Sequence, residues 1–233
     1  IIVIIGVTSG LGRDLAYTFS RKNWQVIGLG RRSEEILHIS KELGENFFGI
    51  EADITKQDEV ENAFSKIDRD FLKIDLIINN ASVFIMKEFI RCKFTEINTI
   101  IDTNLKGIMY VTLEALKIMT KNNNPGRIVN IASVAATHGI ENQAIYCASK
   151  YGINGFSEAL NQELIKSHNI SITTIFPGGM DTPLWNDENP YPGKDKLKIL
   201  KTTDIIGAIE YISTLNPRVI LKNMTIFPSN EWH

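Results

Sequence analysis

The sequence lacks the features of secreted, membrane-spanning or nucleic-acid-binding proteins. Two cysteines in 233 residues, Cys92 and Cys147, are too few for a disulfide scaffold and have no metal-ligand spacing. No apolar run approaches the roughly 18 residues of a membrane span. The net charge of -2 gives no sign of a nucleic-acid or anionic-membrane partner. We therefore expect a cytoplasmic protein without a metal site.

What is present is typical of a globular protein. Hydrophobic residues make up 43% of the chain and charged residues 22%, and 233 residues can bury a sizeable core. The chain has no repeat, low-complexity tract or linker, so we expect a single domain over residues 1–233. It starts on the strand-like run Ile1–Val7 without a Met or a signal-peptide pattern, and we expect residues to precede Ile1.

Short Val- and Ile-rich runs alternate with helical patterns along the chain. The runs predicted as strands are Ile1–Ile5, Trp24–Leu29, Phe47–Glu51, Ile74–Ile78, Arg127–Ala132, Ile170–Phe176 and Val219–Ile226. The predicted helices are Leu11–Lys22, Ser33–Leu43, Gln57–Asp70, Ile97–Lys121 with a bend near Asn104–Gly107, Gln143–Ser167 and Thr203–Leu215. This alternation predicts a doubly wound, Rossmann-type α/β fold, a mostly parallel sheet of about seven strands with helices on both faces.

A glycine-rich turn follows the first strand and leads straight into a helix. Glycines let the backbone approach a pyrophosphate, and a helix N-terminus offers free N–H groups and a positive dipole end. The hydroxyls of Thr8 and Ser9 would add donors. The turn therefore predicts a phosphate site rather than a plain strand–helix connection, with the candidate residues Gly6, Thr8, Ser9, Gly10, Leu11 and Gly12.

The end of the second strand is where a dinucleotide site selects its cofactor. An acid there binds the ribose 2′-OH of NAD, whereas Arg accommodates the 2′-phosphate of NADP. The chain has Arg31 and Arg32 at this point, at a helix start where positive charge is otherwise unfavourable. These residues favour NADP(H) over NAD(H).

Two further strand ends carry polar residues. After the third strand, Asp53 and Ile54 either meet an adenine or form a local turn, and the sequence leaves both interpretations open. After the fourth strand, the side chains of Asn79 and Asn80 can secure neighbouring strands and, with Ala81, border a cofactor, although an Asn-Asn turn alone is weak evidence.

Tyr146 and Lys150 are four residues apart on a predicted helix and so share one face. An ammonium about 4 Å from a phenolate favours the anion by roughly 4 kcal/mol at an effective dielectric constant of about 20. We therefore expect Lys150 to lower the pKa of Tyr146 toward neutrality, where a phenol can exchange a proton with an alcohol or a carbonyl. The spacing alone is more often that of an ordinary amphipathic helix.

In order and spacing, these pieces resemble the short-chain dehydrogenase/reductase family along almost the whole chain. The combination is Gly6-x-x-x-Gly10-x-Gly12, Asn79–Asn80–Ala81, Asn104, Ser133, Tyr146-x-x-x-Lys150, and Pro177–Gly178 with Thr182. Three positions depart from the usual pattern without touching a catalytic group: Ile5, Ser82 and Ala136.

The resemblance implies roles for particular residues. Tyr146 would be the general acid/base, and Ser133 would hydrogen-bond the substrate oxygen. Lys150 would lower the Tyr146 pKa and hold the nicotinamide ribose, and Asn104 would position a water that relays protons from Lys150. Pro177 and Gly178 would border the nicotinamide, and Thr182 would meet its carboxamide or the phosphates. The family's usual pairing of two long helices implies a homodimer or homotetramer.

The implied function is an NADP(H)-dependent oxidoreductase that interconverts a secondary alcohol or a 3-hydroxy acid with its carbonyl. Two alternatives are a reductase of carrier-bound 3-oxoacyl groups, which the mild acidity disfavours, and a non-catalytic dinucleotide-sensing or interaction protein on the same fold. Substrate choice would fall to three segments, and the last reads as a lid over a pocket of modest size: Ser82–Phe89, Thr137–Gln143 and Met180–Lys196. His138 is more plausible as a wall residue than as a catalyst.

Overall fold

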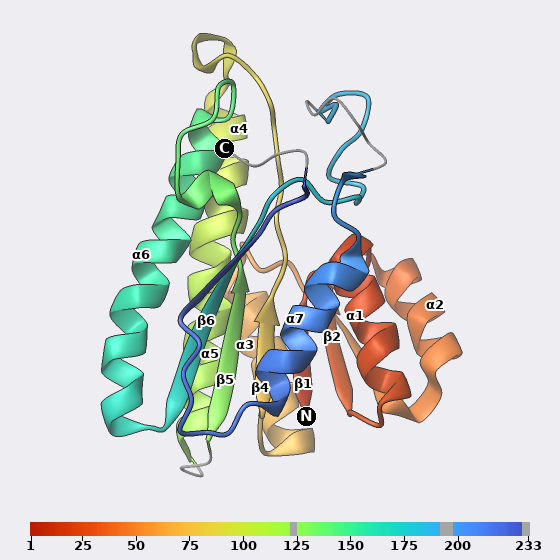
Figure 1. Cartoon of the computed structure of the whole chain (residues 1–233). Helices are drawn as coiled ribbons and strands as arrows, with labels where there is room; N and C mark the ends of the chain where they lie inside the picture. Colours follow the sequence, from red (N-terminus) through yellow and green to blue (C-terminus); the bar gives the residue numbers. More distant parts are fainter. Residues whose placement is uncertain (122–124, 192–197, 230–233) are drawn as a thin grey trace.

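A computed structural model describes residues 1–121, 125–191 and 198–229 of the chain, and its centre is a parallel sheet (Figure 1). Seven strands lie in the order β3-β2-β1-β4-β5-β6-β7, and every adjacent pair is parallel. The strands are β1 (Ile2–Ile5), β2 (Val26–Gly30), β3 (Phe47–Glu51), β4 (Leu76–Asn79), β5 (Gly126–Ile131), β6 (Ile170–Pro177) and β7 (Asn223–Ile226). The predicted doubly wound α/β fold is confirmed.

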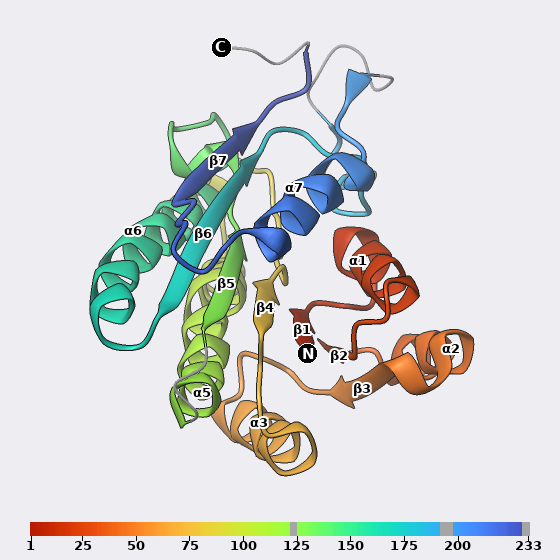
Figure 2. The same cartoon turned by 60° about the horizontal axis from the view of Figure 1, so that its bottom comes forward.

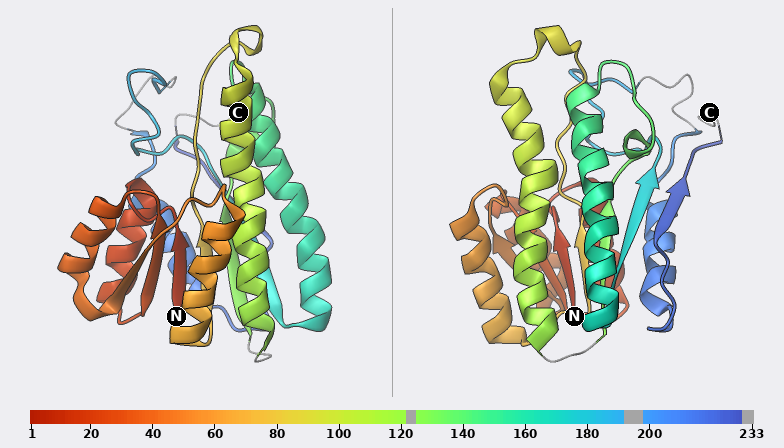
Figure 3. Two further views of the ribbon diagram at one scale, coloured as in Figure 1. Left: turned by 180° about the vertical axis from the view of Figure 1, so that it is seen from behind. Right: turned by 90° about the vertical axis from the view of Figure 1, so that its left-hand side faces the viewer.

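Helices cover both faces of the sheet (Figure 2). On one face lie α1 (Gly10–Arg21), α2 (Ser33–Leu43) and α7 (Thr202–Thr214), and on the other α3 (Gln57–Phe71), α5 (Ile108–Lys121) and α6 (Ala144–Ser167). Figure 3 shows α5 and α6 side by side on the second face. Short 3-10 turns occur at η1 (Gly44–Asn46), η2 (Phe89–Arg91) and η4 (Val134–Ala136). Among the described helices, none has the length and apolarity that a membrane crossing requires.

The apolar runs form strands because both faces of the sheet are covered. Every residue of β1, β2 and β4 is buried, which explains why these segments read as continuous rather than alternating apolar runs. Side chains of β1 alternate between the two layers: Val3 and Ile5 pack with α3 and α5, whereas Ile2 and Ile4 pack with α1 and α7. The two layers of helices therefore pack against the two faces of one sheet.

The predicted bend in the long helix is a π-helical turn, η3 (Asp102–Gly107), between α4 (Phe94–Ile101) and α5. Gly107 packs against Ile54 so closely that a Cβ there would lie 2.9 Å from the Ile54 carbonyl oxygen. The helix begins at Phe94 rather than at the predicted Ile97, because the Glu96 carboxylate accepts a hydrogen bond of 2.7 Å from the Lys93 amide.

Strand boundaries differ slightly from the prediction at β1, β2, β4, β5 and β6, and most at the start of β7. β4 begins at Leu76 rather than Ile74, and β7 comprises Asn223–Ile226 rather than Val219–Ile226. Residues before β7 are drawn into a turn around the Arg127 guanidinium, which donates to the carbonyl oxygens of Val219 and, at 2.8 Å, of Leu215. A side chain from another strand therefore shortens β7, and no local pattern reveals this.

The chain crosses from β3 to β4, which pairs with β1, so the winding direction reverses between β1 and β4. In open α/β sheets, ligands bind beyond the carboxyl ends of the strands at such a switch point. The residues that follow β1, β4 and β5 are therefore brought together along the carboxyl ends of the strands, which we call the carboxyl edge of the sheet.

Behind this edge, a buried polar network connects β4 and β5 to the helices. Asn79 Nδ2 donates to Asn130 Oδ1 at 2.7 Å and to Thr112 Oγ1 at 3.1 Å, while Asn130 Nδ2 donates to Ser157 Oγ at 2.8 Å. All four side chains are buried. Because buried polar groups are costly when unpaired, this network holds β4, β5, α5 and α6 in one arrangement.

We expect Asn130→Ala to lower the free energy of unfolding by about 1–3 kcal/mol, because Asn79 and Ser157 would lose their partner in the interior. Urea denaturation followed by circular dichroism measures this change. The matched control is Asn98→Ala, at an exposed position of α4, for which the change should stay within about 0.5 kcal/mol. Equal effects of both substitutions would contradict a stabilising role of the network.

Candidate active site

The glycine-rich turn joins β1 to α1 through very close backbone contacts. Gly6 has φ +84° and Gly10 has φ +50°, both in the left-handed region that favours glycine. A Cβ on Gly12 would lie 2.1 Å from the Gly6 carbonyl oxygen, and one on Gly6 would lie 2.8 Å from Ala81 Cα. Only glycine fits these two contacts. The turn therefore presents bare backbone and the first turn of α1 to the cavity above it.

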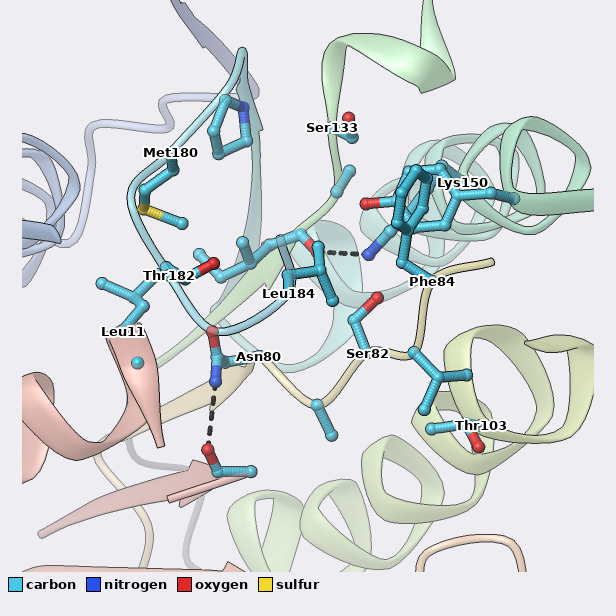
Figure 4. A pocket seen from close by; sticks show the side chains of 18 of the residues that line it. Leu11, Asn80, Ser82, Phe84, Thr103, Ser133, Lys150, Met180, Thr182 and Leu184 are labelled. Carbon is cyan, nitrogen blue, oxygen red and sulfur yellow. Dashed lines mark hydrogen bonds between the residues drawn. The ribbon is translucent and has the colours of Figure 1, made fainter. Parts of the chain in front are cut away.

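Asn80 connects this turn to the end of β4. Its Nδ2 donates a hydrogen bond of 3.2 Å to the Gly6 carbonyl oxygen (Figure 4). The expectation that an Asn after β4 secures a neighbouring strand is thus met for Asn80, and Asn79 serves the network behind it.

A cavity of about 910 Å³ lies along the carboxyl edge of the sheet. This volume is in the upper part of the range of ligand pockets and suits a ligand as large as a dinucleotide. Of the residues predicted to bind a cofactor, only Gly12 is absent from its wall, because it packs beneath Gly6. The predicted residues that line the cavity are Gly6, Thr8, Ser9, Gly10, Leu11, Arg31, Arg32, Asp53, Ile54, Asn80, Ala81, Tyr146, Lys150, Pro177, Gly178 and Thr182.

The two arginines at the end of β2 have different environments. Arg32 Nη2 donates to the Thr8 carbonyl oxygen at 2.7 Å and to Thr8 Oγ1 at 3.0 Å, and Arg32 Nε donates to the same hydroxyl at 3.1 Å. Arg31 is exposed at the cavity wall, and no hydrogen bond or ion pair with another described residue engages it. One guanidinium is therefore positioned by the glycine-rich turn and the other is available to an anion.

Asp53 forms the local turn that the sequence allows, and its contact with an adenine stays a prediction. Its Oδ1 accepts hydrogen bonds from the Thr55 amide at 3.0 Å and the Thr55 hydroxyl at 2.9 Å, which is the local turn. The same residue lines the cavity next to Ile54. The turn therefore holds the carboxylate at the cavity edge.

Tyr146 lies in the first turn of α6, where the helix dipole favours a phenolate, and Lys150 lies one turn later. The Lys150 Nζ is 5.4 Å from the centre of the Tyr146 ring and donates a hydrogen bond of 3.1 Å to the Ile131 carbonyl oxygen (Figure 4). Tyr146 is 6% exposed and Lys150 is 2% exposed. The pair is brought to one cavity, as predicted, but it is deeply buried.

Burial raises the pKa of Tyr146 to about 12, although the side chains of Ser133 and Ser82 oppose this rise. The expected downward shift is therefore wrong in direction here. Desolvation outweighs the charge of Lys150 because burial also lowers the pKa of that ammonium to about 7. At neutral pH the phenol keeps its proton and is a hydrogen-bond donor.

Ser133 is held in place by η4, the short turn that follows β5. Its Oγ accepts a hydrogen bond of 3.1 Å from the Ala135 amide, which leaves the hydroxyl hydrogen to be donated elsewhere. Figure 4 shows Ser133 and Ser82 on the wall of the cavity near Lys150, at the ends of β5 and β4 respectively. In the sequence, Ser82 is only a departure from the family pattern at the start of the Ser82–Phe89 segment, and that pattern does not predict a hydroxyl beside Tyr146 at this position.

Asn104 does not line the cavity. Its Oδ1 accepts from the Val83 amide at 2.8 Å, and its Nδ2 donates to the Val83 carbonyl oxygen at 2.9 Å and to Ser149 Oγ at 3.3 Å. Through Asn104, the π-helical turn η3 is thus hydrogen-bonded both to the segment after β4 and to Ser149 of α6, the residue before Lys150. The side chain positions neighbours of the cavity, and the predicted water relay stays a prediction.

Next to Tyr146 the cavity wall is aromatic. The ring of Phe84 meets that of Tyr146 edge-on at 4.9 Å, Trp185 meets Phe84 at 5.1 Å, and Tyr191 meets Trp185 at 5.3 Å. All four rings line the cavity. The sequence marked the segments of Phe84 and Trp185 as variable, but no spacing rule predicts that three rings extend in series from Tyr146.

The segment after β6 covers the cavity, as expected for a lid. The side chain of Thr182 lies over the glycine-rich turn, since a Cβ on Gly10 would be 3.3 Å from Thr182 Cβ. Asn189 Oδ1 accepts a hydrogen bond of 2.7 Å from the Met86 amide. Residues 192–196 of the predicted lid lie outside the described residues.

His138 lines the cavity wall, and its Nδ1 is 3.2 Å from Thr137 Oγ1. Within residues 1–121, 125–191 and 198–229, no group of three or more His, Cys, Asp or Glu side chains is arranged to hold a metal ion. Tyr146 and Lys150 line the same cavity, and burial shifts the pKa of both, so they are the titratable pair of the site.

The buried lysine makes stability depend on pH. Between pH 7 and about pH 10 the unfolded chain keeps a Lys150 proton that the folded protein has released, so the free energy of unfolding rises with pH. The slope is at most about 1.4 kcal/mol per pH unit. We expect the free energy of unfolding of Lys150→Met to lack this rise with pH. Urea denaturation of both proteins at about pH 7 and pH 9 measures it. Parallel pH curves for the two proteins would contradict the lowered pKa.

Comparisons with known proteins agree with this geometry. Residues 1–192 match the family described as short chain dehydrogenase. The chain is 30% identical to a serine 3-dehydrogenase of Agrobacterium fabrum, over 99% of this chain and 94% of the relative. It is 33% identical to a 3-oxoacyl-(acyl-carrier-protein) reductase of Escherichia coli (strain K12), over 79% of this chain and 75% of the relative.

Solved structures show the same likeness. A closed form of serine dehydrogenase complexed with NADP+ superposes with a TM-score of 0.91 at 27% identity, covering 100% of this chain and 97% of the other. The serine dehydrogenase of Escherichia coli gives a TM-score of 0.88 at 26% identity, covering 100% and 99%. The family match covers well over half of the chain and coincides with a buried Tyr–Lys pair and a glycine-rich turn in one cavity. The chain belongs to the short-chain dehydrogenase family.

Proposed function

We propose that the protein is an NADP(H)-dependent oxidoreductase that interconverts a secondary alcohol or a 3-hydroxy acid with its carbonyl, with Tyr146 as the general acid/base. The observation that carries this proposal is that a protonated phenol, a serine hydroxyl and a buried lysine meet in the cavity that the glycine-rich turn also lines. Relatives named as dehydrogenases and reductases, and a neighbour complexed with NADP+, support it.

The residues around the cavity fit NADP(H). The contacts that exclude any Cβ at Gly6 and Gly12 leave backbone N–H groups and the N-terminus of α1 for the pyrophosphate. Arg31 and Arg32 would take the 2′-phosphate, and Pro177, Gly178 and Thr182 would border the nicotinamide. When bound, the cofactor supplies the hydride, while the protein supplies orientation and a proton.

Tyr146 and Ser133 would act on the substrate oxygen. In the direction of reduction, negative charge develops on the carbonyl oxygen, and two hydroxyl donors placed beforehand stabilise it where it forms. The raised pKa of Tyr146 keeps the phenol protonated, so it can donate a hydrogen bond and then its proton. In the direction of oxidation the same phenol must first lose its proton, and the neighbouring Lys150 and the helix dipole favour that anion.

We expect Tyr146→Phe to lower kcat by a factor of about 10²–10⁴, the usual contribution of a general acid, while the Kd of NADPH changes less than about threefold. The assays are NADPH oxidation at 340 nm over a panel of ketones and aldehydes, and NADPH fluorescence titration. Tyr151→Phe, at an exposed position one turn further along α6, is the matched control and should leave kcat unchanged. Undiminished turnover by Tyr146→Phe would refute the assignment.

The preference for NADP(H) rests on the end of β2. Arg32 is oriented by its hydrogen bonds to Thr8, so its guanidinium lies against the turn that would hold the pyrophosphate. Arg31 is free to bind a phosphate bidentately, which an ammonium cannot do. We propose that Arg31 contributes the larger part of the discrimination, because its donors are uncommitted.

We expect Arg31→Ala to raise the KM of NADPH by about 10- to 100-fold, because a charge-assisted hydrogen bond contributes about 1.5–3 kcal/mol. The KM of NADH, which lacks the 2′-phosphate, should change less than about threefold. Arg13→Ala, at a solvent-facing position of α1, is the control and should leave both constants unchanged. A wild-type enzyme that prefers NADH would overturn the proposal.

Reduction of a carrier-bound 3-oxoacyl group has less support. Two of the cations that follow β4 are paired, Lys87 with Glu96 at 2.5 Å and Arg91 with Glu88 at 2.9 Å, so they are less available to an acidic carrier. A dinucleotide sensor without catalysis would have no need for a phenol and two serine hydroxyls beside a buried lysine. Both alternatives are therefore weaker than a reductase of small carbonyl compounds.

The state of assembly and the location remain proposals. We propose a homodimer or homotetramer that pairs α5 and α6, because Leu113 and Tyr151 are 55% and 46% exposed on these helices. We also propose a cytoplasmic location; both cysteines, Cys92 and Cys147, are free thiols, as a reducing compartment would leave them.

A further inference from the structure

Resting on this proposed function, we infer that the substrate is an uncharged ketone or aldehyde, or the matching alcohol, that carries an aromatic or bulky apolar group next to the reacting carbon. The cavity wall around Tyr146 decides between the two substrate classes left open above. It offers ring faces and edges to an apolar substituent, and its described residues include no arginine and only the buried Lys150 as a lysine to pair with a carboxylate.

The apolar part of the site is the series of rings from Tyr146 outward. Phe84 lies directly against the Tyr146 ring, Trp185 against Phe84, and Tyr191 against Trp185, each pair edge-to-face. Apolar side chains complete this wall: Val134, Ile140, Met180, Leu184 and Phe227. An aromatic substituent placed beside these rings gains edge-to-face contacts besides removing apolar area from water.

The charges of the cavity are divided between its two ends. Arg31 follows β2, whereas Ser133 follows β5, and strands β1 and β4 lie between them, about 14 Å at about 4.8 Å per strand. A substrate that reaches Tyr146 therefore lies far from both arginines. The cofactor's own phosphates would also occupy them.

At the substrate end, the charged or titratable side chains among the described residues of the wall are Glu141, His138, Tyr146, Lys150 and Tyr191. Lys150 is 2% exposed, and its Nζ donates to the Ile131 carbonyl oxygen. Glu141 is exposed and would repel a carboxylate. Among the described residues at this end, the carboxylate of a 3-hydroxy acid or a free amino acid would therefore meet no arginine and no lysine other than the buried Lys150, and burying it unpaired is costly.

Part of the apolar wall belongs to the predicted lid. Trp185 and Tyr191 lie in the segment in which Asn189 Oδ1 accepts a hydrogen bond from the Met86 amide, and the ring of Trp185 contacts that of Phe84. The hydrogen bond to Met86 therefore holds this side of the wall close to the residues that follow β4.

The test uses four carbonyl compounds that differ in one group each. Methyl benzoylformate, methyl pyruvate, benzoylformate and pyruvate are compared by kcat/KM with NADPH at pH 7.5. We expect methyl benzoylformate to exceed methyl pyruvate at least tenfold, because the phenyl ring finds the aromatic wall. It should exceed benzoylformate at least thirtyfold, because the described residues beside Tyr146 hold no exposed arginine or lysine for the carboxylate. In oxidation with NADP+, 1-phenylethanol should exceed both 3-hydroxybutyrate and L-serine.

Variants connect this preference to the wall. In Trp185→Ala the ratio of kcat/KM for methyl benzoylformate over methyl pyruvate should fall at least fivefold. Tyr211→Ala, at an exposed position of α7 outside the cavity, is the control and should keep the wild-type ratio. An unchanged ratio in Trp185→Ala would overturn the assignment of the rings to substrate recognition.

The result that overturns the inference can be told apart from a failure of the proposed function. If benzoylformate, pyruvate or L-serine is the better substrate, the protein is a reductase or dehydrogenase but its substrate class is not the one inferred. If none of the compounds is turned over, the oxidoreductase proposal fails. Binding to the NADPH-loaded protein, followed by tryptophan fluorescence, then decides the inference: tighter binding of methyl benzoylformate supports it, and equal or tighter binding of benzoylformate overturns it.

Discussion

The packing of Gly12 against the carbonyl oxygen of Gly6 is the contact on which the cavity depends. It sets the end of β1 beside the first turn of α1 with no side chain between them. The same carbonyl accepts from Asn80, so the ends of β1 and β4 are joined at the point where the sheet changes its winding direction. Since both faces of the sheet are covered by helices, this edge is left for a ligand.

Burial acts in opposite directions on the two titratable groups of the site. It raises the pKa of Tyr146 and lowers that of Lys150, so both groups are pushed toward their neutral forms near neutral pH. A neutral phenol is ready to donate, and a lysine whose pKa lies near neutrality can exchange protons at little cost. Helical spacing indicated that the two side chains share a face, but it carries no information about desolvation, and so it predicted the wrong direction for Tyr146.

Prediction from the sequence succeeded best where the structure of a site depends on residues that are close together in the chain. Gly6 and Gly10 after β1, the arginines after β2, and Tyr146 four residues before Lys150 line the cavity as expected. Local patterns give no information where a distant segment intervenes. Arg127 contacts the residues before β7, and the ring of Phe84 meets that of Tyr146 from a distant part of the sequence.

By itself, the sequence determined the class of fold, the order of elements and the positions of the chemical groups, because hydrophobic periodicity and glycine chemistry act over a few residues. Only the tertiary structure decided the protonation of Tyr146 and Lys150, the division of charge between the two ends of the cavity, and the series of rings that begins at Tyr146. These properties depend on which segments exclude water from which side chains, and solvent exclusion is a property of the packed chain rather than of any stretch of it.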